Sequence, residues 1–215
     1  MTTLAIIRER LAQALEDPTN LKWSENELTE AIRQALDAYS HYLPYRAIGT
    51  VTLAAAGREI DLSAVNFSTI DRVWWDYDDA DPRHPPAWRD FEIWPGSILY
   101  INDAAEPAID DVVRIWFSGP HTLEGLDTAT ATTFPAFHTS HLILGASAYA
   151  ALNRNLTILE LANVNSWAAR NLREWAQIQL ARYQHTLERL ARESAAAGSG
   201  IASAPPLDRW DPVRW

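Results

Sequence analysis

The sequence predicts an α+β protein, in which helices from both ends of the chain form a bundle around a small antiparallel β insert. Apolar residues recur at helical spacing before residue 42 and after residue 134, and they alternate at strand spacing between these segments. We expect four regions: bundle helices over 1–48, an acidic β-rich insert over 49–133, further bundle helices over 134–195 and an extended tail over 196–215.

Two helices are predicted before the insert. The first covers 2–15 and ends at Asp17-Pro18, because proline cannot continue the helical hydrogen-bond ladder. The second starts after Ser24, an N-cap residue that forms a capping box with Glu27, and it runs to about residue 41. Its expected buried face consists of Leu28, Ala31, Ile32, Ala35, Leu36 and Tyr39.

The apolar period changes to two from Gly49. Residues 50–53 and 59–62 flank a loop that contains Gly57, and this pattern predicts a β-hairpin. Further strands are predicted over four segments, with a tight turn at Pro95-Gly96 between the second and the third. These segments are 70–77, 91–94, 97–101 and 112–117.

A helix is predicted over 135–153, and its small residues at 145–148 would let another helix approach closely. Its expected buried residues are Phe137, Leu142, Leu144, Ala148 and Leu152. The last helix starts near residue 165 and would be over about 40 Å long, which is more than a small core needs. Its apolar stripe is Ala169, Leu172, Ala176, Leu180, Tyr183, Leu187 and Leu190.

Negative charge is concentrated in the insert. Residues 59–127 hold 15 Asp and Glu against 4 Arg, a net of −11, so the rest of the chain sums to +1 of the total −10. Such a segment repels DNA phosphates unless its acids face away from them. The basic residues are 17 Arg and one Lys, a bias that suits bidentate pairing in interfaces or reflects a GC-rich genome.

Composition and motifs argue against several classes of protein. The chain has no cysteine, no apolar run of membrane-spanning length and no signal-peptide pattern, so we expect a soluble protein that is not secreted and does not bind membranes. It lacks a P-loop, a GxSxG motif and a dinucleotide fingerprint. We therefore expect neither an enzyme nor a cofactor.

Two groups of residues are weak candidates for a metal site. The acidic segment 76–81 fails the EF-hand pattern, because Asp81 stands where the loop needs glycine and Ala87 where it needs glutamate. His138 and His141 can share a helix face, but no third ligand follows at a recognisable spacing. A solvated loop and an ordinary helix start are the simpler interpretations.

Five of the ten tryptophans fall in the insert. Trp74 and Trp75 are adjacent in a predicted strand, so they point to opposite faces and one must be covered by another element or another subunit. We expect both at a subunit interface. In an alternative hypothesis, Trp88 and Trp94 are stacking platforms of a module that binds or hydrolyses carbohydrate.

The C-terminal segment is the second candidate interaction site. It follows a Gly-Ser-Gly sequence and ends in two Arg-Trp pairs, Arg209-Trp210 and Arg214-Trp215. A merely disordered tail is depleted in aromatic residues. We expect these four residues to bind a partner, while a tail folded back on its own domain is the alternative. In the preceding helix, Arg170, Arg173 and Arg182 are candidates for pairing with acids of a neighbouring subunit.

The residues Trp23, Ser24, Glu27, Leu28, Ala31, Ile32, Ala35 and Leu36 form a motif before the insert. In this motif, and in the order of its elements, the chain resembles head–tail connector proteins of tailed bacteriophages, also called adaptor or head-completion proteins. The likeness in organisation covers residues 1–195 and is sharpest over 20–45.

The resemblance implies a structural virion protein in the neck, made in the host cytoplasm. It implies a homo-oligomeric ring, commonly twelve-fold, that docks on the portal, contacts a tail or next connector protein, and lets double-stranded DNA pass without specific binding. By analogy, residues 196–215 would reach the portal. A tail-completion or tail-tube protein is an alternative within the same class.

Overall fold

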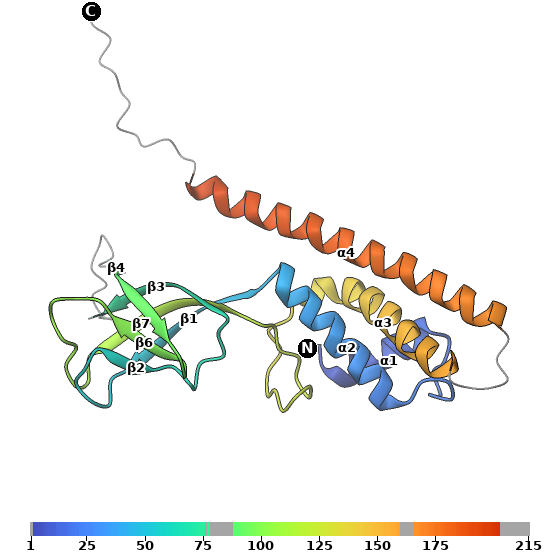
Figure 1. Cartoon of the computed structure of the whole chain (residues 1–215), viewed down its shortest axis with the longest axis horizontal. Coiled ribbons are helices and arrows are strands. Elements are labelled where there is room, and N and C mark those ends of the chain that lie inside the picture. The colour runs from blue at the N-terminus through green and yellow to red at the C-terminus, as the bar shows by residue number, and fades with distance from the viewer. Residues whose placement is uncertain (1, 76, 78–87, 160–165, 203–215) are drawn as a thin grey trace, which may run out of the picture. The chain divides into compact units, whose positions relative to one another are not determined.

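The computed structural model describes residues 2–75, 77, 88–159 and 166–202. It is an α+β structure with antiparallel sheets, which confirms the predicted class (Figure 1). Two compact units are present: a helical unit made of residues up to 43 and from 122 onward, and a β unit over 44–121. The structure thus separates the units at 43/44 and 121/122, where the sequence suggested boundaries at 48/49 and 133/134.

The two N-terminal helices start at side-chain caps. Helix α1 spans Leu4–Ala14 with Thr3 as its N-cap, and α2 spans Glu25–Tyr42. Both halves of the predicted capping box are present, since Ser24 accepts from the backbone N–H of Glu27 while the Glu27 carboxylate accepts from that of Ser24. The predicted buried face of α2 is confirmed, and its six residues are at most 3% exposed.

The turn between α1 and α2 is organised by a buried carboxylate. Asp17 accepts hydrogen bonds from the backbone N–H groups of Leu21, Lys22 and Trp23 at 2.9, 2.7 and 2.9 Å. Burial alone would raise the pKa of Asp17, but the three backbone donors outweigh it and the pKa lies below 3.8. The turn therefore contains an ionised, hydrogen-bonded carboxylate.

Helix α3 spans Thr139–Leu159 after a 3₁₀ turn at Ala136–His138, and α4 spans Ser166–Ala202. The predicted stripe of α4 is confirmed as its buried side, with Ala176, Tyr183 and Leu187 fully buried. The predicted close approach is also confirmed, because Tyr183 packs on Gly145. The prediction for Phe137 was wrong: it lies in the 3₁₀ turn rather than on the helix face, and it is 79% exposed.

The end of α4 differs from the prediction. The sequence placed a flexible linker at Gly198-Ser199-Gly200, whereas the helix continues through these residues to Ala202. Glycine costs about 1 kcal/mol in a helix relative to alanine, and this penalty does not stop a helix that is already propagating. Of the expected tail 196–215, residues 203–215 lie outside the described residues.

One sheet of the β unit has the order β1-β7-β3-β4 and is antiparallel throughout. Its strands are Tyr45–Thr52, Val112–Gly119, Thr69–Trp75 and Trp88–Arg89. The predicted hairpin between 50–53 and 59–62 was wrong, because β1 pairs along its whole length with β7. An eight-residue pairing between distant strands is therefore formed in place of the local hairpin that the turn residues suggested.

The other sheet has the order β2-β6-β5, with strands Glu59–Asp61, Ile98–Ile101 and Phe91–Trp94. The predicted turn at Pro95-Gly96 connects β5 to β6, and Gly96 has the positive φ of 84° that this turn needs. The inner faces of both sheets contribute to one core, which makes the unit a small sandwich. This core contains Leu53, Ile60, Leu62, Val73, Trp75, Leu99, Ile101, Val113 and Ile115.

Candidate interaction surfaces

The outer face of the β1-β7-β3-β4 sheet carries alternating arginine and tryptophan residues. Cross-strand pairing places Ile48 beside Trp116 and Trp116 beside Arg72. The neighbouring row pairs Arg114 with Trp74 and Trp74 with Trp88. These side chains lie on the face opposite the core, because Val73, Val113 and Ile115, between them in sequence, point inward.

The arginines of this face lie over the aromatic rings. The Arg72 guanidinium is 4.9 Å from the centre of the Trp88 ring, and that of Arg114 is 4.2 Å from the Tyr77 ring and 5.6 Å from the Trp116 ring. Trp88 meets Trp116 edge to face with ring centres 4.9 Å apart. Because these contacts hold the side chains in place before any partner binds, the face is a preorganised surface.

A hollow of about 400 Å³ lies on this face. Its wall combines apolar rings and cations, and Ile48 and Trp88 remain 51% and 41% exposed. Tryptophan and arginine are the residue types that contribute most to binding energy in protein interfaces. The hollow is lined by Arg46, Ala47, Ile48, Asp71, Arg72, Trp88, Trp116 and Phe117.

The structure shows what covers each member of the Trp74-Trp75 pair. Trp75 belongs to the sandwich core and donates from Nε1 to the Asp111 carboxylate at 2.8 Å. Trp74 points outward and is 6% exposed, because Tyr77 and Trp88 pack edge to face against it. The two side chains do point to opposite faces, and elements of their own unit bury both. Their proposed place in a subunit interface stays a prediction.

The outer face of the β2-β6-β5 sheet is acidic. Glu59, Asp61 and Glu92 project from it and are exposed. Hydrogen bonds from Trp94 Nε1 and Asn102 Nδ2 to Glu92, both 3.1 Å, lower the pKa of its carboxyl below 4.5. The pKa of Asp61 is lowered likewise, by hydrogen bonds from Ser63. Glu92 and Asp61 are therefore ionised at neutral pH.

Helix α4 has a second face that its own unit does not bury. Trp167, Trp175 and Ile178 fall within roughly 80° on a helical wheel and are 68%, 38% and 56% exposed. All three predicted arginines of α4 are exposed, and within the described residues none of them forms an ion pair with the chain's own acids. These are Arg170, Arg173 and Arg182.

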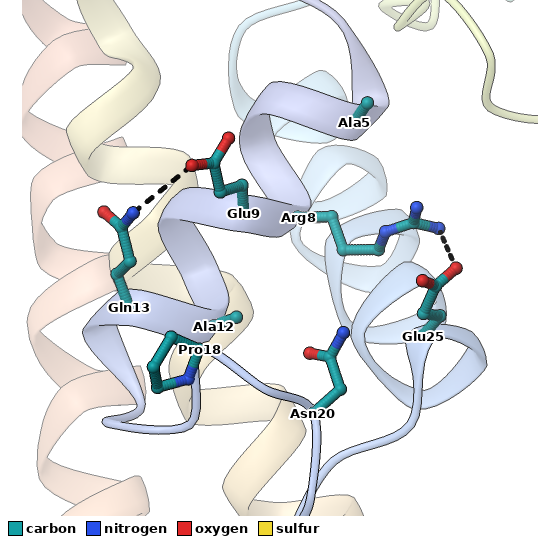
Figure 2. A pocket seen from close by; sticks show the side chains of 8 residues that line it. All are labelled: Ala5, Arg8, Glu9, Ala12, Gln13, Pro18, Asn20 and Glu25. Carbon is teal, nitrogen blue, oxygen red and sulfur yellow. Dashed lines mark hydrogen bonds and ion pairs between the residues drawn. The ribbon is translucent and has the colours of Figure 1, made fainter.

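A hollow of about 230 Å³ lies beside α1 and the start of α2 (Figure 2). The Arg8–Glu25 ion pair of 3.0 Å closes one side of it, and a hydrogen bond of 3.4 Å from Gln13 Nε2 to Glu9 lies on the other (Figure 2). Each charged side chain at this hollow faces solvent over part of its surface. The arrangement offers no nucleophile beside a base, so we assign no chemistry to it.

The described residues hold no group of three or more potential metal-binding side chains. His138 and His141 do lie close, with ring centres 5.5 Å apart, but His138 Nδ1 is hydrogen-bonded to the Tyr39 hydroxyl at 2.5 Å. His138 therefore belongs to the packing between α2 and the start of α3. The acidic segment 76–81 lies outside the described residues apart from Tyr77.

The remaining predicted site residues are the four in the C-terminal segment and the proposed stacking tryptophans Trp88 and Trp94. Arg209, Trp210, Arg214 and Trp215 lie outside the described residues, so their role stays a prediction. Trp88 and Trp94 are in different sheets, and each already has a ring face in contact: Arg72 lies over Trp88, and Trp94 stacks on Tyr100 at 4.3 Å. Within the part of the chain described, the two do not share one stacking platform.

The sequence analysis did not predict the arginines on the outer face of the β1-β7-β3-β4 sheet. Arg46, Arg72 and Arg114 were not identified as site residues, although Arg72-Val73-Trp74 and Arg114-Ile115-Trp116 both repeat an Arg-x-Trp pattern. In a strand, residues two apart share a face, so the pattern itself predicts an Arg/Trp surface. The sequence does not reveal that β3 pairs with β7, and this pairing places the two Arg-x-Trp segments side by side on one face.

Within the described residues, no helix is both long and apolar enough to span a bilayer. No protein-family model matches the chain, and no curated protein sequence does either. Among solved structures, the chain is similar to a chain of "Neck of empty GTA particle computed with C6 symmetry". The TM-score is 0.31 and the identity 16%, over 76% of this chain and 80% of that one. At this TM-score the likeness is too slight to carry a conclusion about function.

Proposed function

We propose that the chain is a non-enzymatic structural protein of a virion neck. In this proposal, it forms an oligomeric head–tail adaptor ring that docks on the portal through its C-terminal segment and continues the DNA channel towards the tail. The ring is built in the host cytoplasm, and a tail or next connector protein binds its other end.

The proposal rests on two properties of α4: it is longer than its partner helix α3, and it has an exposed face with apolar side chains in addition to its buried face. Its 37 residues span about 55 Å, whereas its partner α3 has 21 residues and spans about 32 Å (Figure 1). Tyr183 of α4 meets Gly145, the seventh residue of α3, so antiparallel packing leaves the last turns of α4 beyond the start of α3. A single copy of the bundle does not need this extra length.

The outward side of α4 suits contact with other chains. It combines exposed Trp175 and Ile178 with Arg170 and Arg182, which the described part of the chain does not pair with acids. Apolar anchors beside unpaired cations are typical of a protein interface rather than of a solvated helix face. The capping-box motif that carries the resemblance to connector proteins is formed as expected.

The charge of the chain supports a passive DNA channel. A net charge of −10 disfavours tight binding to phosphates, and DNA that must move through a ring needs a surface that does not hold it. We propose that acidic residues of the β insert line the channel. A ring whose channel surface is strongly positive would contradict this part of the proposal.

The test is binding of the full-length chain to the portal protein encoded by the same genome, followed by electron microscopy of the complex. The chain without residues 203–215, and the variant Trp210→Ala with Trp215→Ala, should lose portal binding. Phe137→Ala is the matched control, because it removes an aromatic side chain that is 79% exposed outside both candidate surfaces. Circular dichroism should show unchanged helix content in each variant.

Two results would contradict the proposal. The first is a full-length chain that remains monomeric in the presence of the portal. The second is portal binding that survives removal of 203–215, which would favour a tail-completion or tail-tube protein.

Electron microscopy of particles lacking the chain should show filled heads without attached tails.

A further inference from the structure

The two outer faces of the β sandwich point in opposite directions, and among the described residues arginines predominate on one and carboxylates on the other. The inner faces of both sheets share one core, so the outer face of β1-β7-β3-β4 and that of β2-β6-β5 cannot face each other within one copy. We call the first the basic face and the second the acidic face.

The exposed cations of the basic face are Arg46 and Arg72, while Arg114 lies on the same face over the Tyr77 and Trp116 rings. Asp71, at the β-bulge between Ile70 and Arg72, is the acidic residue at its hollow. This face is unusual for the insert, in which acids outnumber arginines 15 to 4 over residues 59–127. A local positive charge in a strongly acidic segment indicates a surface that binds acids.

The acidic face contributes three carboxylates from its strands, Glu59, Asp61 and Glu92. Cross-strand pairing places Tyr100 between Glu59 and Glu92, so no cation of the sheet separates the two carboxylates. The nearby Arg58 donates from its guanidinium to the carbonyl oxygen of Ala104 at 3.1 Å. Arg58 also lines a hollow together with Glu59 and Tyr100, so one cation lies at the edge of this face beside its three carboxylates. The excess negative charge is left for a partner to neutralise.

Apolar groups accompany the charges on both faces. Ile48 and Trp88 border the hollow of the basic face and are 51% and 41% exposed. On the acidic face, Trp94 is 37% exposed and is fixed by stacking on Tyr100 with an interplanar angle of 10°. Each face thus combines exposed apolar side chains with charges that are mainly of one sign.

We propose that the basic face of one copy binds the acidic face of a second copy, head to tail. Two basic faces repel each other, and so do two acidic faces, so the charges favour the mixed contact and disfavour the symmetric ones. A mixed contact leaves one free face of each kind, and further copies add until a ring closes or a filament grows. The inference rests on the proposed function only for closure into a ring.

The experiment uses two full-length charge-reversal variants whose association is measured by analytical ultracentrifugation. Arg46→Glu with Arg72→Glu disables the basic face, and Glu59→Lys with Glu92→Lys disables the acidic face. Each variant alone should self-associate about a hundredfold more weakly than the wild type. Mixed together, they should associate again, because one variant then carries two acidic faces and the other two basic faces, and these attract each other.

The control matched to the basic-face variant is Arg10→Glu with Lys22→Glu, which lowers the net charge by the same amount at exposed positions of the helical unit. It should associate like the wild type. Association of the wild type should also weaken as salt rises, since exposed charge pairs are screened. Circular dichroism identifies any variant that fails to fold, and alanine replacements at the same positions then take its place.

Three results would overturn the inference. They are a wild-type chain that stays monomeric at roughly 100 µM, variants that assemble like the wild type, and a mixture of the two variants that does not associate. None of these bears on whether the chain binds the portal or lies in the neck, so the inference and the proposed function can fail separately.

Discussion

The ring of Tyr183 in α4 packs directly on Gly145 in α3. A Cβ atom at residue 145 would lie 2.5 Å from the Tyr183 Cε1 atom and 2.7 Å from Cδ1 and Cζ. The Tyr183 hydroxyl donates to the backbone carbonyl oxygen of Ala35 in α2 at 2.7 Å. One fully buried side chain therefore joins three helices of the bundle.

Gly145→Ala should destabilise the chain even though alanine is the better helix former. The gain in helix propensity is about 1 kcal/mol. The Tyr183 ring is buried and has little room to move, so the overpacking cost of about 1–3 kcal/mol should outweigh this gain. Urea unfolding followed by circular dichroism measures the change in the free energy of unfolding.

A double-mutant cycle identifies the cause of that loss. In a Tyr183→Leu background the ring is absent, so Gly145→Ala should cost less than in the wild type. An equal cost in both backgrounds would show that the contact between α3 and α4 is not the reason.

Stability should fall at alkaline pH because of Tyr183. Burial raises the pKa of its phenol well above the ordinary value of 10.0. The unfolded chain ionises near pH 10 while the folded chain keeps the proton, so this contribution is complete below pH 10 and is lost as pH rises. The loss should approach about 1.4 kcal/mol per pH unit above that point.

Tyr183→Phe provides the comparison for this pH dependence. The variant should be less stable by about 1 kcal/mol at neutral pH, since it lacks the hydrogen bond to Ala35. Between pH 10 and 12 its free energy of unfolding should fall less steeply than that of the wild type. Parallel curves would mean that another group carries the dependence.

The turn before α2 should weaken at acid pH. The pKa of Asp17 in the folded chain lies below 3.8, so its contribution is present above that pH and is lost as pH falls through the lower, folded value. The urea midpoint of the wild type should therefore drop between pH 4 and pH 2. Asp17→Asn should be less stable at neutral pH and should show a smaller drop.

The contribution of the capping box to the free energy of unfolding should be measurable by itself. Ser24→Ala removes the acceptor of the Glu27 backbone N–H, and we expect a loss of about 1 kcal/mol in the free energy of unfolding. Ser24→Thr keeps a hydroxyl and should restore most of it. A Ser24→Ala variant as stable as the wild type would show that packing of Trp23 and Leu28 alone positions the start of α2.

Some parts of the structure follow from the sequence by local physics. The capping box needs residues three apart, and the buried stripe of α4 needs only a period of 3.6, so both were predicted residue by residue. The turn at Pro95-Gly96 likewise depends on the backbone freedom of one glycine. Such features are decided within about one or two helical turns, where the sequence contains all of the interacting groups.

Other parts were decided only by tertiary structure. The residues around Gly57 suggested a local hairpin, yet β1 pairs over its whole length with β7, which lies more than fifty residues away in the sequence. That pairing, with β3 on the other side of β7, aligns Ile48, Trp116 and Arg72 in one row. The sequence by itself determined the α+β class, the two helical ends and the acidic insert. Only the pairing of distant strands decided that the insert has a basic and an acidic face, because strand partners are chosen by burial across the whole unit.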